Sequence, residues 1–276
     1  MTDQPTLTLN DGVRMPQFGL GVWQTPPDQA AEVVKTAVEA GYRSVDTAAV
    51  YRNERGVGDG LKTAGAAGQD VFLTTKLWNE NQGYDAALKA FDDSLARLGR
   101  ESVDLYLIHW PSPQRGLYVD SWKALVKLKA DGRAKSIGVS NFQAEHLEKI
   151  IGETGVVPAV NQVELHPRFQ QTALRAAHAR HGIATESWSP LGQGQLLSDP
   201  QIAAIAEKHG KTPAQVVIRW HLDSGLIVIP KSVTPARIRE NIAVFDFSLD
   251  AADLAAIAAL DSPTGRIGPD PMTATF

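Results

Sequence analysis

Short β-branched runs alternate with helical patterns along almost the whole of this chain. About eight strand–helix repeats follow one another, and no linker or low-complexity stretch divides them. Alternation of this kind is typical of βαβ units and predicts a parallel sheet. Eight units are the number found in a TIM barrel. We therefore expect residues 1–276 to form a single α/β domain with a (β/α)₈ barrel fold.

The expected elements can be given by residue range. Residues 7–9 and 13–16 predict an N-terminal β-hairpin around Asp11-Gly12, a pair that fits a tight turn. The expected barrel strands are 18–22, 44–46, 71–76, 103–108, 136–139, 159–164, 183–187 and 226–229. Asp28 is the expected cap of the first helix, which ends at Gly41. The other expected helices are 54–64, 85–98, 121–130, 144–151, 172–181, 200–209, 213–223, 235–243 and 251–260, so extra helices are expected near the C-terminus.

A doubly wound open sheet is the main rival, because it is built from the same units. Its dinucleotide-binding fingerprint is missing. The glycines of the run 56–60 lie inside a helical pattern, and Gly19-Leu20-Gly21 lacks the third glycine. The glycine pattern therefore favours the barrel.

Composition excludes several classes of function. The formal net charge is -4, so the chain has no bulk attraction to nucleic acid or to anionic lipid. There is no cysteine, which excludes disulfides, thiolate catalysis and cysteine-based metal sites. The first ten residues are polar, and no apolar run approaches the roughly 18 residues that a membrane span needs. We expect a cytoplasmic protein with no nucleic-acid or membrane partner.

Polar side chains stand where successive expected strands end, which is where barrel enzymes carry their chemistry. Asp46, Lys76 and His109 end or follow three consecutive strands. Each has an ordinary interpretation: a helix cap for Asp46, a side chain that leaves the barrel for Lys76, and a core histidine for His109. Tyr51, soon after the second strand, could be an interface aromatic. The coincidence at three consecutive strand ends favours a site, because buried ionisable groups need partners.

These four residues suit proton transfer to a carbonyl oxygen. A tyrosine has a pKa of about 10, which is too high for an effective acid near neutrality. A protonated Lys76 beside Tyr51 is expected to lower that pKa, with Asp46 holding the ammonium in place. Neutral His109 could donate a hydrogen bond to the substrate oxygen. The histidines follow no metal-ligand spacing, so no metal site is expected.

The sequence resembles the aldo-keto reductase superfamily over nearly its whole length, and in particular the bacterial branch that contains 2,5-diketo-D-gluconate reductase. The segments that carry the resemblance are GYRSVDTA at 41–48, Tyr51 with Asn53-Glu54, TTKLWN at 74–79, VDLYLIHWP at 103–111, IGVSNF at 137–142, NQVELHP at 161–167, SPLG at 189–192 and IPKS at 229–232. Trp23, Arg52 and Thr234 depart from what many relatives carry, Arg52 replacing a glycine. So many ordered blocks make the match specific.

The resemblance implies NADPH-dependent reduction of aldehydes and ketones, keto-sugars and keto-acids among them, by a monomer. It implies Asp46, Tyr51, Lys76 and His109 as the catalytic tetrad. The implied cofactor residues are Ser140, Asn141 and Gln162 at the nicotinamide carboxamide, Trp188 stacked on the nicotinamide ring, Ser189, Leu191, Gly192, Gln193 and Gly194 at the pyrophosphate, and Ile229, Lys231, Ser232, Val233, Arg237, Glu240 and Asn241 at the adenosine end. Trp23, Ala48, Trp78 and Trp110 are implied to line the substrate pocket.

Two other functions remain open from the sequence. One is a non-catalytic member of the family, such as the potassium-channel β subunits that share the barrel. The other is a Schiff-base aldolase on a TIM barrel that uses Lys76. The complete set of Asp46, Tyr51, Lys76 and His109 argues against a non-catalytic member. A Schiff-base aldolase would be active without a cofactor. The reductase is the favoured interpretation.

Overall fold

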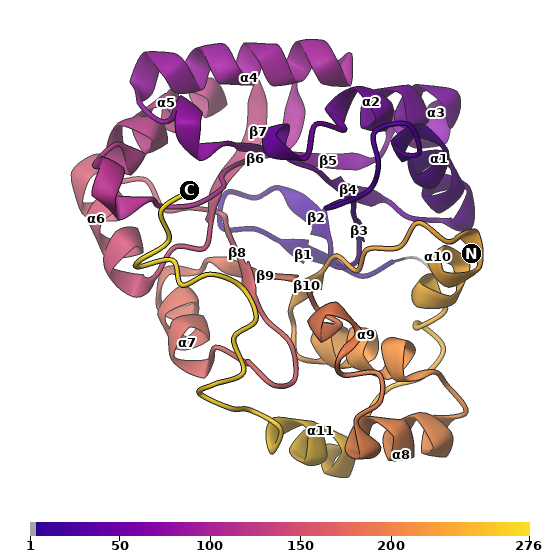
Figure 1. Ribbon diagram of the computed structural model, residues 1–276. Helices are drawn as coiled ribbons and strands as arrows, with labels where there is room; N and C mark the ends of the chain where they lie inside the picture. The colour runs from indigo at the N-terminus through magenta and orange to yellow at the C-terminus, as the bar shows by residue number, and fades with distance from the viewer. Residues whose placement is uncertain (1–3) are drawn as a thin grey trace.

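The computed structural model describes residues 4–276; the first three residues, part of the polar N-terminal stretch and of the expected domain 1–276, lie outside the described residues. Eight strands form one parallel sheet in the order β3 to β10. Parallel bridges join Phe18 to Val228 and Gly21 to Lys231, so the last strand returns to the first and the sheet closes. The expected (β/α)₈ barrel is confirmed, with helices surrounding the strands in Figure 1.

The element bounds agree with the expected ranges to within a few residues at most ends. The strands are β1 Thr6–Thr8, β2 Arg14–Pro16, β3 Leu20–Gly21, β4 Ser44–Asp46, β5 Phe72–Leu77, β6 Val103–Ile108, β7 Ala134–Ser140, β8 Val160–Glu164, β9 Ala184–Trp188 and β10 Ile227–Val228. The helices are α1 Ala30–Ala40, α2 Glu54–Thr63, α3 Ala66–Gln69, α4 Tyr84–Leu98, α5 Tyr118–Ala130, α6 Ala144–Thr154, α7 Thr172–His181, α8 Pro200–His209, α9 Pro213–Asp223, α10 Pro235–Ile242 and α11 Ala251–Ala258.

Two local expectations were wrong, and one short helix was missed. Asp28 does not cap α1, because the residue before the helix is Gln29, which already has helical dihedral angles and makes no side-chain cap. The first barrel strand is only Leu20–Gly21, since Phe18 joins the sheet through a single bridge. The short helix α3 was not expected, and its four residues are too few to show a period.

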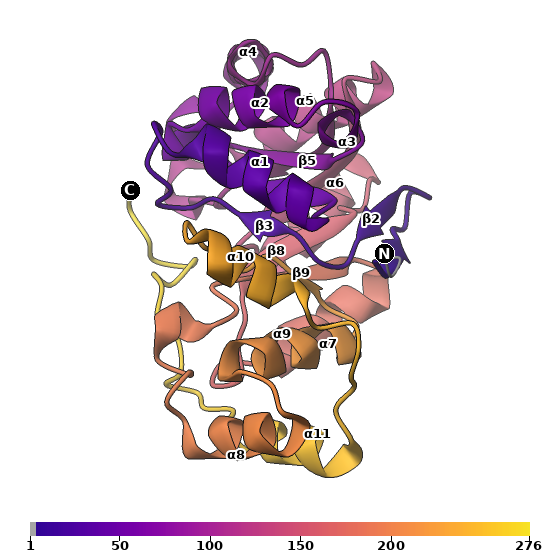
Figure 2. The same ribbon diagram turned by 90° about the vertical axis from the view of Figure 1, so that its right-hand side faces the viewer.

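The β1–β2 hairpin closes the floor of the barrel. Leu7 pairs with Met15 across it, and Met15 is fully buried in a cluster with Leu105, Leu107 and Val160 from inside the barrel. Figure 2 shows the hairpin at one end of the barrel and the C-terminus at the other. The interior is therefore apolar at its lower end, which leaves the opposite end for polar side chains.

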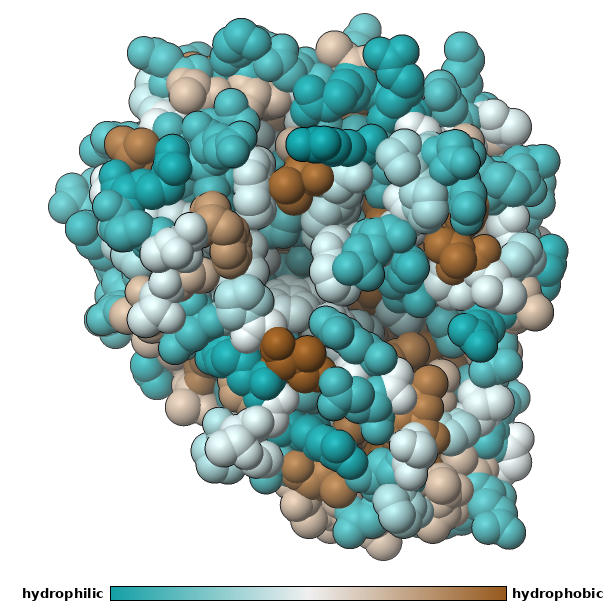
Figure 3. Space-filling model, viewed as in Figure 1, coloured by the Kyte–Doolittle hydropathy of each residue, from teal (hydrophilic) through white to brown (hydrophobic). Residues whose placement is uncertain are grey.

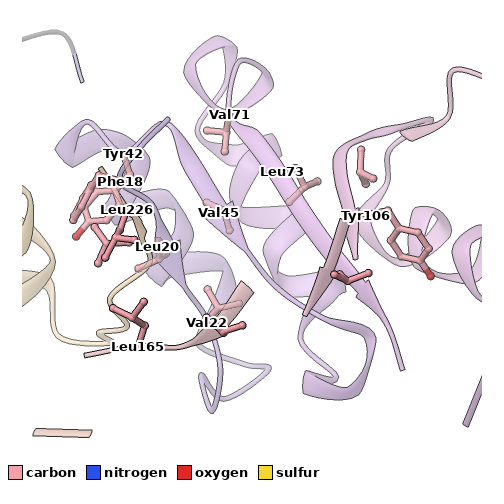
Figure 4. Close-up of a cluster of buried hydrophobic side chains, with 14 of the residues drawn as sticks. Phe18, Leu20, Val22, Tyr42, Val45, Val71, Leu73, Tyr106, Leu165 and Leu226 are labelled. Atoms are coloured by element: carbon pink, nitrogen blue, oxygen red, sulfur yellow. The ribbon is translucent and has the colours of Figure 1, made fainter. Parts of the chain in front are cut away.

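Strand residues alternate between the barrel interior and the layer of helices. Val45 packs in the outer core that the helices cover, whereas the next residue, Asp46, meets Gln162 inside the barrel. Figure 4 shows Val45 and Leu73 side by side in that outer core. Gly58 lets α2 approach α4, because a Cβ there would lie 2.3 Å from the Leu98 carbonyl oxygen. This packing explains the glycine run 56–60 as a helix–helix contact.

Two helices lie outside the ring that follows the strand order. In Figures 1 and 2, α8 and α11 lie together at the lower edge of the molecule. The Lys208 ammonium joins them through Asp250 at 2.5 Å and Asp253 at 2.7 Å. The expectation of extra C-terminal helices is confirmed. Within residues 4–276, no helix combines the length and the hydropathy that a membrane crossing requires.

Candidate active site

A cavity of about 640 Å³ opens at the C-terminal ends of the barrel strands. Figure 3 shows the centre of this face hollowed. It is lined by many of the residues expected at the site, namely Trp23, Asp46, Tyr51, Trp78, His109, Trp110, Asn141, Gln162, Trp188, Ser189, Gln193, Ile229 and Lys231. It is also lined by residues that the sequence did not single out, namely Gly21, Gln24, Val50, Pro190, Gly268, Pro269 and Phe276.

Lys76 and Asp46 form a buried ion pair beneath the cavity. The Lys76 Nζ lies 2.5 Å from Asp46 Oδ1 and also donates to the Thr47 carbonyl at 2.9 Å. Burial is the largest single influence and lowers the pKa of Lys76, but the acidic groups Asp46, Tyr51 and Glu186 together outweigh it, so the pKa of Lys76 is raised. Burial also raises the pKa of Asp46, which Lys76 opposes. The ammonium is therefore held charged at a fixed place, and a buried charge is stable only with such partners.

Tyr51 is held at the cavity wall by a short 3-10 turn, Ala49–Tyr51, that follows β4. Arg52 comes next in the left-handed region, with φ 58°, a conformation that glycine adopts more easily than arginine. Buried Asn53 fixes the turn, accepting a hydrogen bond from Thr47 Oγ1 at 2.8 Å and donating to the Val22 carbonyl at 2.9 Å. The hydrogen bonds of Asn53 to Thr47 and Val22 thus hold the loop that carries Tyr51.

The pKa of Tyr51 differs from the expectation in its direction. Lys76 Nζ lies 5.3 Å from the centre of the Tyr51 ring. Burial raises the pKa of Tyr51, and Lys76 opposes that rise without overcoming it, so the pKa is raised rather than lowered. Lys76 does lower the pKa as expected, but the net lowering was wrong, because the loss of water around the hydroxyl, with the negative charges of Asp46 and Glu186 in addition, exceeds the effect of one ammonium. Tyr51 consequently keeps its proton at neutral pH.

His109 follows β6 and faces Tyr51, with the two ring centres 5.6 Å apart. Burial, with the positive charge of Lys76 second, lowers the pKa of His109 well below its ordinary value. The imidazole is therefore neutral at pH 7. A neutral imidazole carries one N–H, so His109 can donate one hydrogen bond into the cavity.

Sequence reasoning missed a second carboxyl group inside the barrel. Glu186 on β9 is fully buried, and Gln162 donates to it at 2.9 Å while also donating to Asp46 at 2.8 Å. A signal was available, because a glutamate within an expected barrel strand must be buried or compensated.

Trp188 stands at the end of β9 with one face toward the cavity. Its indole N–H donates to Asn141 Oδ1 at 2.8 Å, and Asn141 donates to the His109 carbonyl at 2.9 Å. Ser140 is fully buried beside them, and its hydroxyl donates to the Gln162 carbonyl at 2.8 Å. The ring of Trp188 is thereby fixed to the strand ends that hold the proposed catalytic residues.

The other expected cofactor residues extend away from the cavity along two segments. Ser189 and Gln193 line the cavity with positive φ angles of 49° and 53°. Ile229 and Lys231 line it from the end of β10. The other expected residues of these two segments do not line the cavity; they are Leu191, Gly192, Gly194, Ser232, Val233, Arg237, Glu240 and Asn241.

At the start of α10 the expected adenosine-end residues differ in their surroundings. Arg237 is exposed in the first turn and makes no side-chain hydrogen bond or ion pair with residues 4–276. Thr234, before the helix, makes no side-chain cap. Glu240 accepts from the Thr212 hydroxyl at 2.9 Å, so its carboxylate faces α9. The helix start therefore offers free backbone N–H groups and a free guanidinium, which together suit an anion.

Aromatic rings form the outer side of the cavity. Trp78 lies 5.3 Å from the His109 ring and is stacked on Phe276 at 5.8 Å. Phe276 also meets Trp110 edge-on at 5.0 Å. The expected position of Ala48 was wrong, because Ala48 is fully buried beneath the Tyr51 turn and does not line the cavity. Phe276 was missed because it lies far along the chain from the rings it contacts.

The segment after α11 crosses the cavity mouth and is held there by Glu164. This buried carboxylate accepts the backbone N–H groups of Ile267 at 2.5 Å and Gly268 at 2.8 Å. A Cβ on Gly268 would lie 2.5 Å from the Trp188 ring, so only glycine allows this approach. The C-terminal segment thus becomes part of the site. Among residues 4–276, no group of three or more histidine or carboxylate side chains is arranged to hold a metal ion.

If Trp188 stacks on the nicotinamide, its emission should be quenched when NADPH binds. We expect Trp188→Leu to lose most of the quenching that the wild type shows in a fluorescence titration. Trp220→Phe, on α9 away from the cavity, is the matched control and should retain it. Unchanged quenching in Trp188→Leu would place the stacking partner elsewhere.

Comparison with known proteins gives concordant results. The model of the aldo/keto reductase family matches residues 15–262. An aldo-keto reductase of Mycolicibacterium smegmatis is 58% identical over 272 residues, which cover 99% of this chain and 98% of the relative. Methylglyoxal reductase DkgA of Escherichia coli is 52% identical over 273 residues, with 98% of each covered. A crystal structure of a Gox0644 mutant in complex with NADPH is 61% identical, has a TM-score of 0.96 and covers 99% of this chain and 100% of that one.

Proposed function

The chain belongs to the aldo/keto reductase family, and we propose that it reduces small neutral aldehydes and ketones with Tyr51 as the proton donor. It is an NADPH-dependent oxidoreductase, and its branch of the family includes 2,5-diketo-D-gluconate and methylglyoxal reductases. One observation carries the assignment of Tyr51. The buried Lys76–Asp46 pair holds a fixed positive charge beside the only tyrosine that lines the cavity of residues 4–276.

NADPH, when bound, supplies the hydride that reduces the carbonyl carbon. Tyr51 gives its proton to the carbonyl oxygen as negative charge develops there. Lys76 opposes the rise that burial causes in the pKa of Tyr51, which makes the loss of this proton easier than burial alone would allow. Lys76 then stabilises the phenolate that Tyr51 becomes, and Asp46 keeps the ammonium aligned. Neutral His109 donates a hydrogen bond that orients the carbonyl.

The residues present fit the cofactor at both ends. At the nicotinamide end, Trp188 offers a ring face, while Ser140, Asn141 and Gln162 offer polar groups at adjacent strand ends. At the adenosine end, the free start of α10 and the unpaired Arg237 suit a phosphate. We propose that Ser189, Leu191, Gly192, Gln193 and Gly194 hold the pyrophosphate, and that Ile229, Lys231, Ser232, Val233, Arg237, Glu240 and Asn241 hold the adenosine end.

The charge of the cavity lining supports a neutral substrate. The outer wall consists of Trp23, Trp78, Trp110 and Phe276, and Lys231 is the only lysine or arginine among the lining residues described. Lys231 lies at the end of β10, on the proposed cofactor side. A substrate carboxylate would lose water without gaining a cation, which is costly. Keto-acids are therefore proposed to be poor substrates, and neutral aldehydes and ketones good ones.

Matched pairs of carbonyl compounds test this proposal. Methyl pyruvate and pyruvate carry the same reducible ketone but differ in charge, as do methyl phenylglyoxylate and phenylglyoxylate. With NADPH in excess, we expect kcat/KM to be at least about 100-fold higher for the neutral member of each pair, which corresponds to roughly 2.7 kcal/mol. Equal values, or a preference for the acids, would contradict the proposed substrate class.

Preference for NADPH over NADH is proposed to depend on Arg237. Charge-assisted hydrogen bonds contribute about 1.5–3 kcal/mol. Arg237→Ala should therefore weaken NADPH binding by roughly 10–100-fold in calorimetric titrations and leave NADH binding nearly unchanged. Arg239→Ala, on the same helix, is the control and should change neither. Equal losses for both cofactors would show that Arg237 does not interact with the 2′-phosphate.

We propose that residues 1–276 form one domain that acts as a cytoplasmic monomer. A continuous hydrophobic core that includes residues from β3 to α11 supports the single domain. Sedimentation equilibrium measures the mass directly, and a species of about twice 29.8 kDa would contradict the monomer.

A further inference from the structure

Glu186 is a fully buried carboxyl group that the proposed proton transfer does not use. It lies on β9 directly opposite Gln162 of β8 in the parallel pair. The Gln162 amide nitrogen donates to Glu186 Oε2 at 2.9 Å and to Asp46 Oδ2 at 2.8 Å. Glu186 Oε1 is buried and has no hydrogen-bond partner among residues 4–276. A buried acceptor without a partner is destabilising, so a glutamate here is not explained by stability.

We propose that Glu186 is a positioning residue for the nicotinamide end of the cofactor site, because it fixes the orientation of the Gln162 amide. This inference rests on the proposed assignment of Gln162 to the nicotinamide carboxamide. An amide nitrogen carries two protons, and the two carboxyl groups accept both of them. The amide oxygen is therefore what Gln162 offers to a ligand in the cavity that it lines.

The orientation of the Gln162 amide decides which group of the nicotinamide carboxamide it can bind. An acceptor from Gln162 pairs with the NH₂ group of a nicotinamide carboxamide and not with its carbonyl oxygen. If the Gln162 amide turned over, its oxygen would lie at 2.8 Å from a carboxylate oxygen of Asp46, and an N–H would face the cavity instead. Glu186 and Asp46 together exclude that state. Removal of Glu186 leaves Asp46 as the only acceptor that orients the amide.

Glu186 also places a titratable charge in the barrel interior. The charged and titratable groups that face it are Asp46 from β4, Lys76 from β5 and Tyr51 from the turn after β4. Burial, followed by the negative charge of Asp46, raises the pKa of Glu186 to about 8. The carboxyl group is thus largely neutral at pH 7 and gains a negative charge as the pH rises through 8. The oxidised nicotinamide ring is positively charged and the reduced ring is neutral, so the ionised form favours NADP⁺.

Binding measurements on two variants test the positioning role. In Glu186→Leu the acceptor is lost, and calorimetry should show NADPH binding weakened by about 3–10-fold, the value of one hydrogen bond. Glu186→Gln retains an acceptor oxygen and should bind NADPH within about 2-fold of the wild type. Adenosine 2′,5′-bisphosphate lacks the nicotinamide, and its affinity should be unchanged in both variants. Glu186→Leu binding NADPH as tightly as the wild type, or losing both ligands equally, would overturn the proposal.

Gln162→Leu separates this inference from the assignment on which it rests. Weakened NADPH binding in Gln162→Leu but not in Glu186→Leu would refute the role of Glu186 alone. Unchanged binding in both variants would refute the assignment of Gln162 and the inference together.

A pH series adds a measurement that does not need the leucine variant to fold. In the wild type, the ratio of the Kd of NADP⁺ to the Kd of NADPH should fall by about 10-fold between pH 7 and pH 9. In Glu186→Gln the ratio should stay constant, since the titrating group is gone. The 2′-phosphate is common to both nucleotides and cancels in the ratio. An equal fall in Glu186→Gln would overturn the proposal.

Discussion

Tyr51→Phe should lower kcat by about 10²–10⁴-fold, the range that general acid catalysis contributes. The substitution removes only the hydroxyl group and keeps the ring that faces His109. NADPH affinity should stay close to the wild-type value, because no proposed cofactor contact is removed. The rate is best measured as NADPH oxidation in a single turnover, so that product release does not mask the chemical step.

Tyr84→Phe is the matched control for this experiment. Tyr84 begins α4 on the surface, outside the cavity, and its variant should retain wild-type kcat. A Tyr51→Phe enzyme that keeps more than about a tenth of the wild-type single-turnover rate would show that another group donates the proton, since the loss would fall below the range expected for a general acid.

Lys76→Met should abolish most of the activity and also destabilise the fold. The variant leaves the Asp46 carboxylate inside the barrel without its cation, and breaking a buried ion pair in this way costs about 3–5 kcal/mol. We expect urea unfolding to show a loss of that size in the free energy of unfolding. Activity should fall as far as in Tyr51→Phe, because no cation remains to stabilise the phenolate.

The double variant Asp46→Asn with Lys76→Met separates the two effects. It removes both charges, so much of the lost stability should return, while the activity should not. A Lys76→Met protein as stable as the wild type would show that Asp46 does not depend on Lys76. Recovery of activity in the double variant would show that the ammonium has no part in catalysis.

The fold was predictable because its elements carry strong local signals. The strands Ser44–Asp46 and Val103–Ile108 and the helices Thr172–His181 and Pro200–His209 have the expected bounds. The hydrophobic period, the length and the flanking turn residues of these elements suffice to predict their bounds. The predicted cap at Asp28 was wrong. A polar residue before a helix is a frequent signal for a cap, but here Gln29 stands between Asp28 and the helix and already has helical dihedral angles.

The site was predictable where its residues end consecutive strands, because the topology of a barrel then brings them together. Asp46, Lys76 and His109 are of this kind. The direction of the Tyr51 pKa was not predictable, since it depends on how completely the hydroxyl is buried. Phe276 could not be expected either, because nothing in the chain near residue 276 indicates that it stacks on Trp78.

Isotope transfer follows the hydride from NADPH to the carbonyl carbon. The wild-type enzyme is incubated with methylglyoxal and NADPH that carries deuterium at both C4 positions of the dihydronicotinamide ring, and the product is analysed by NMR. We expect one alcohol to form per NADPH oxidised, with one deuterium on the carbinol carbon and none on the carbinol oxygen after exchange with water. An unlabelled alcohol, or NADPH oxidation without an alcohol, would contradict hydride transfer to the carbonyl.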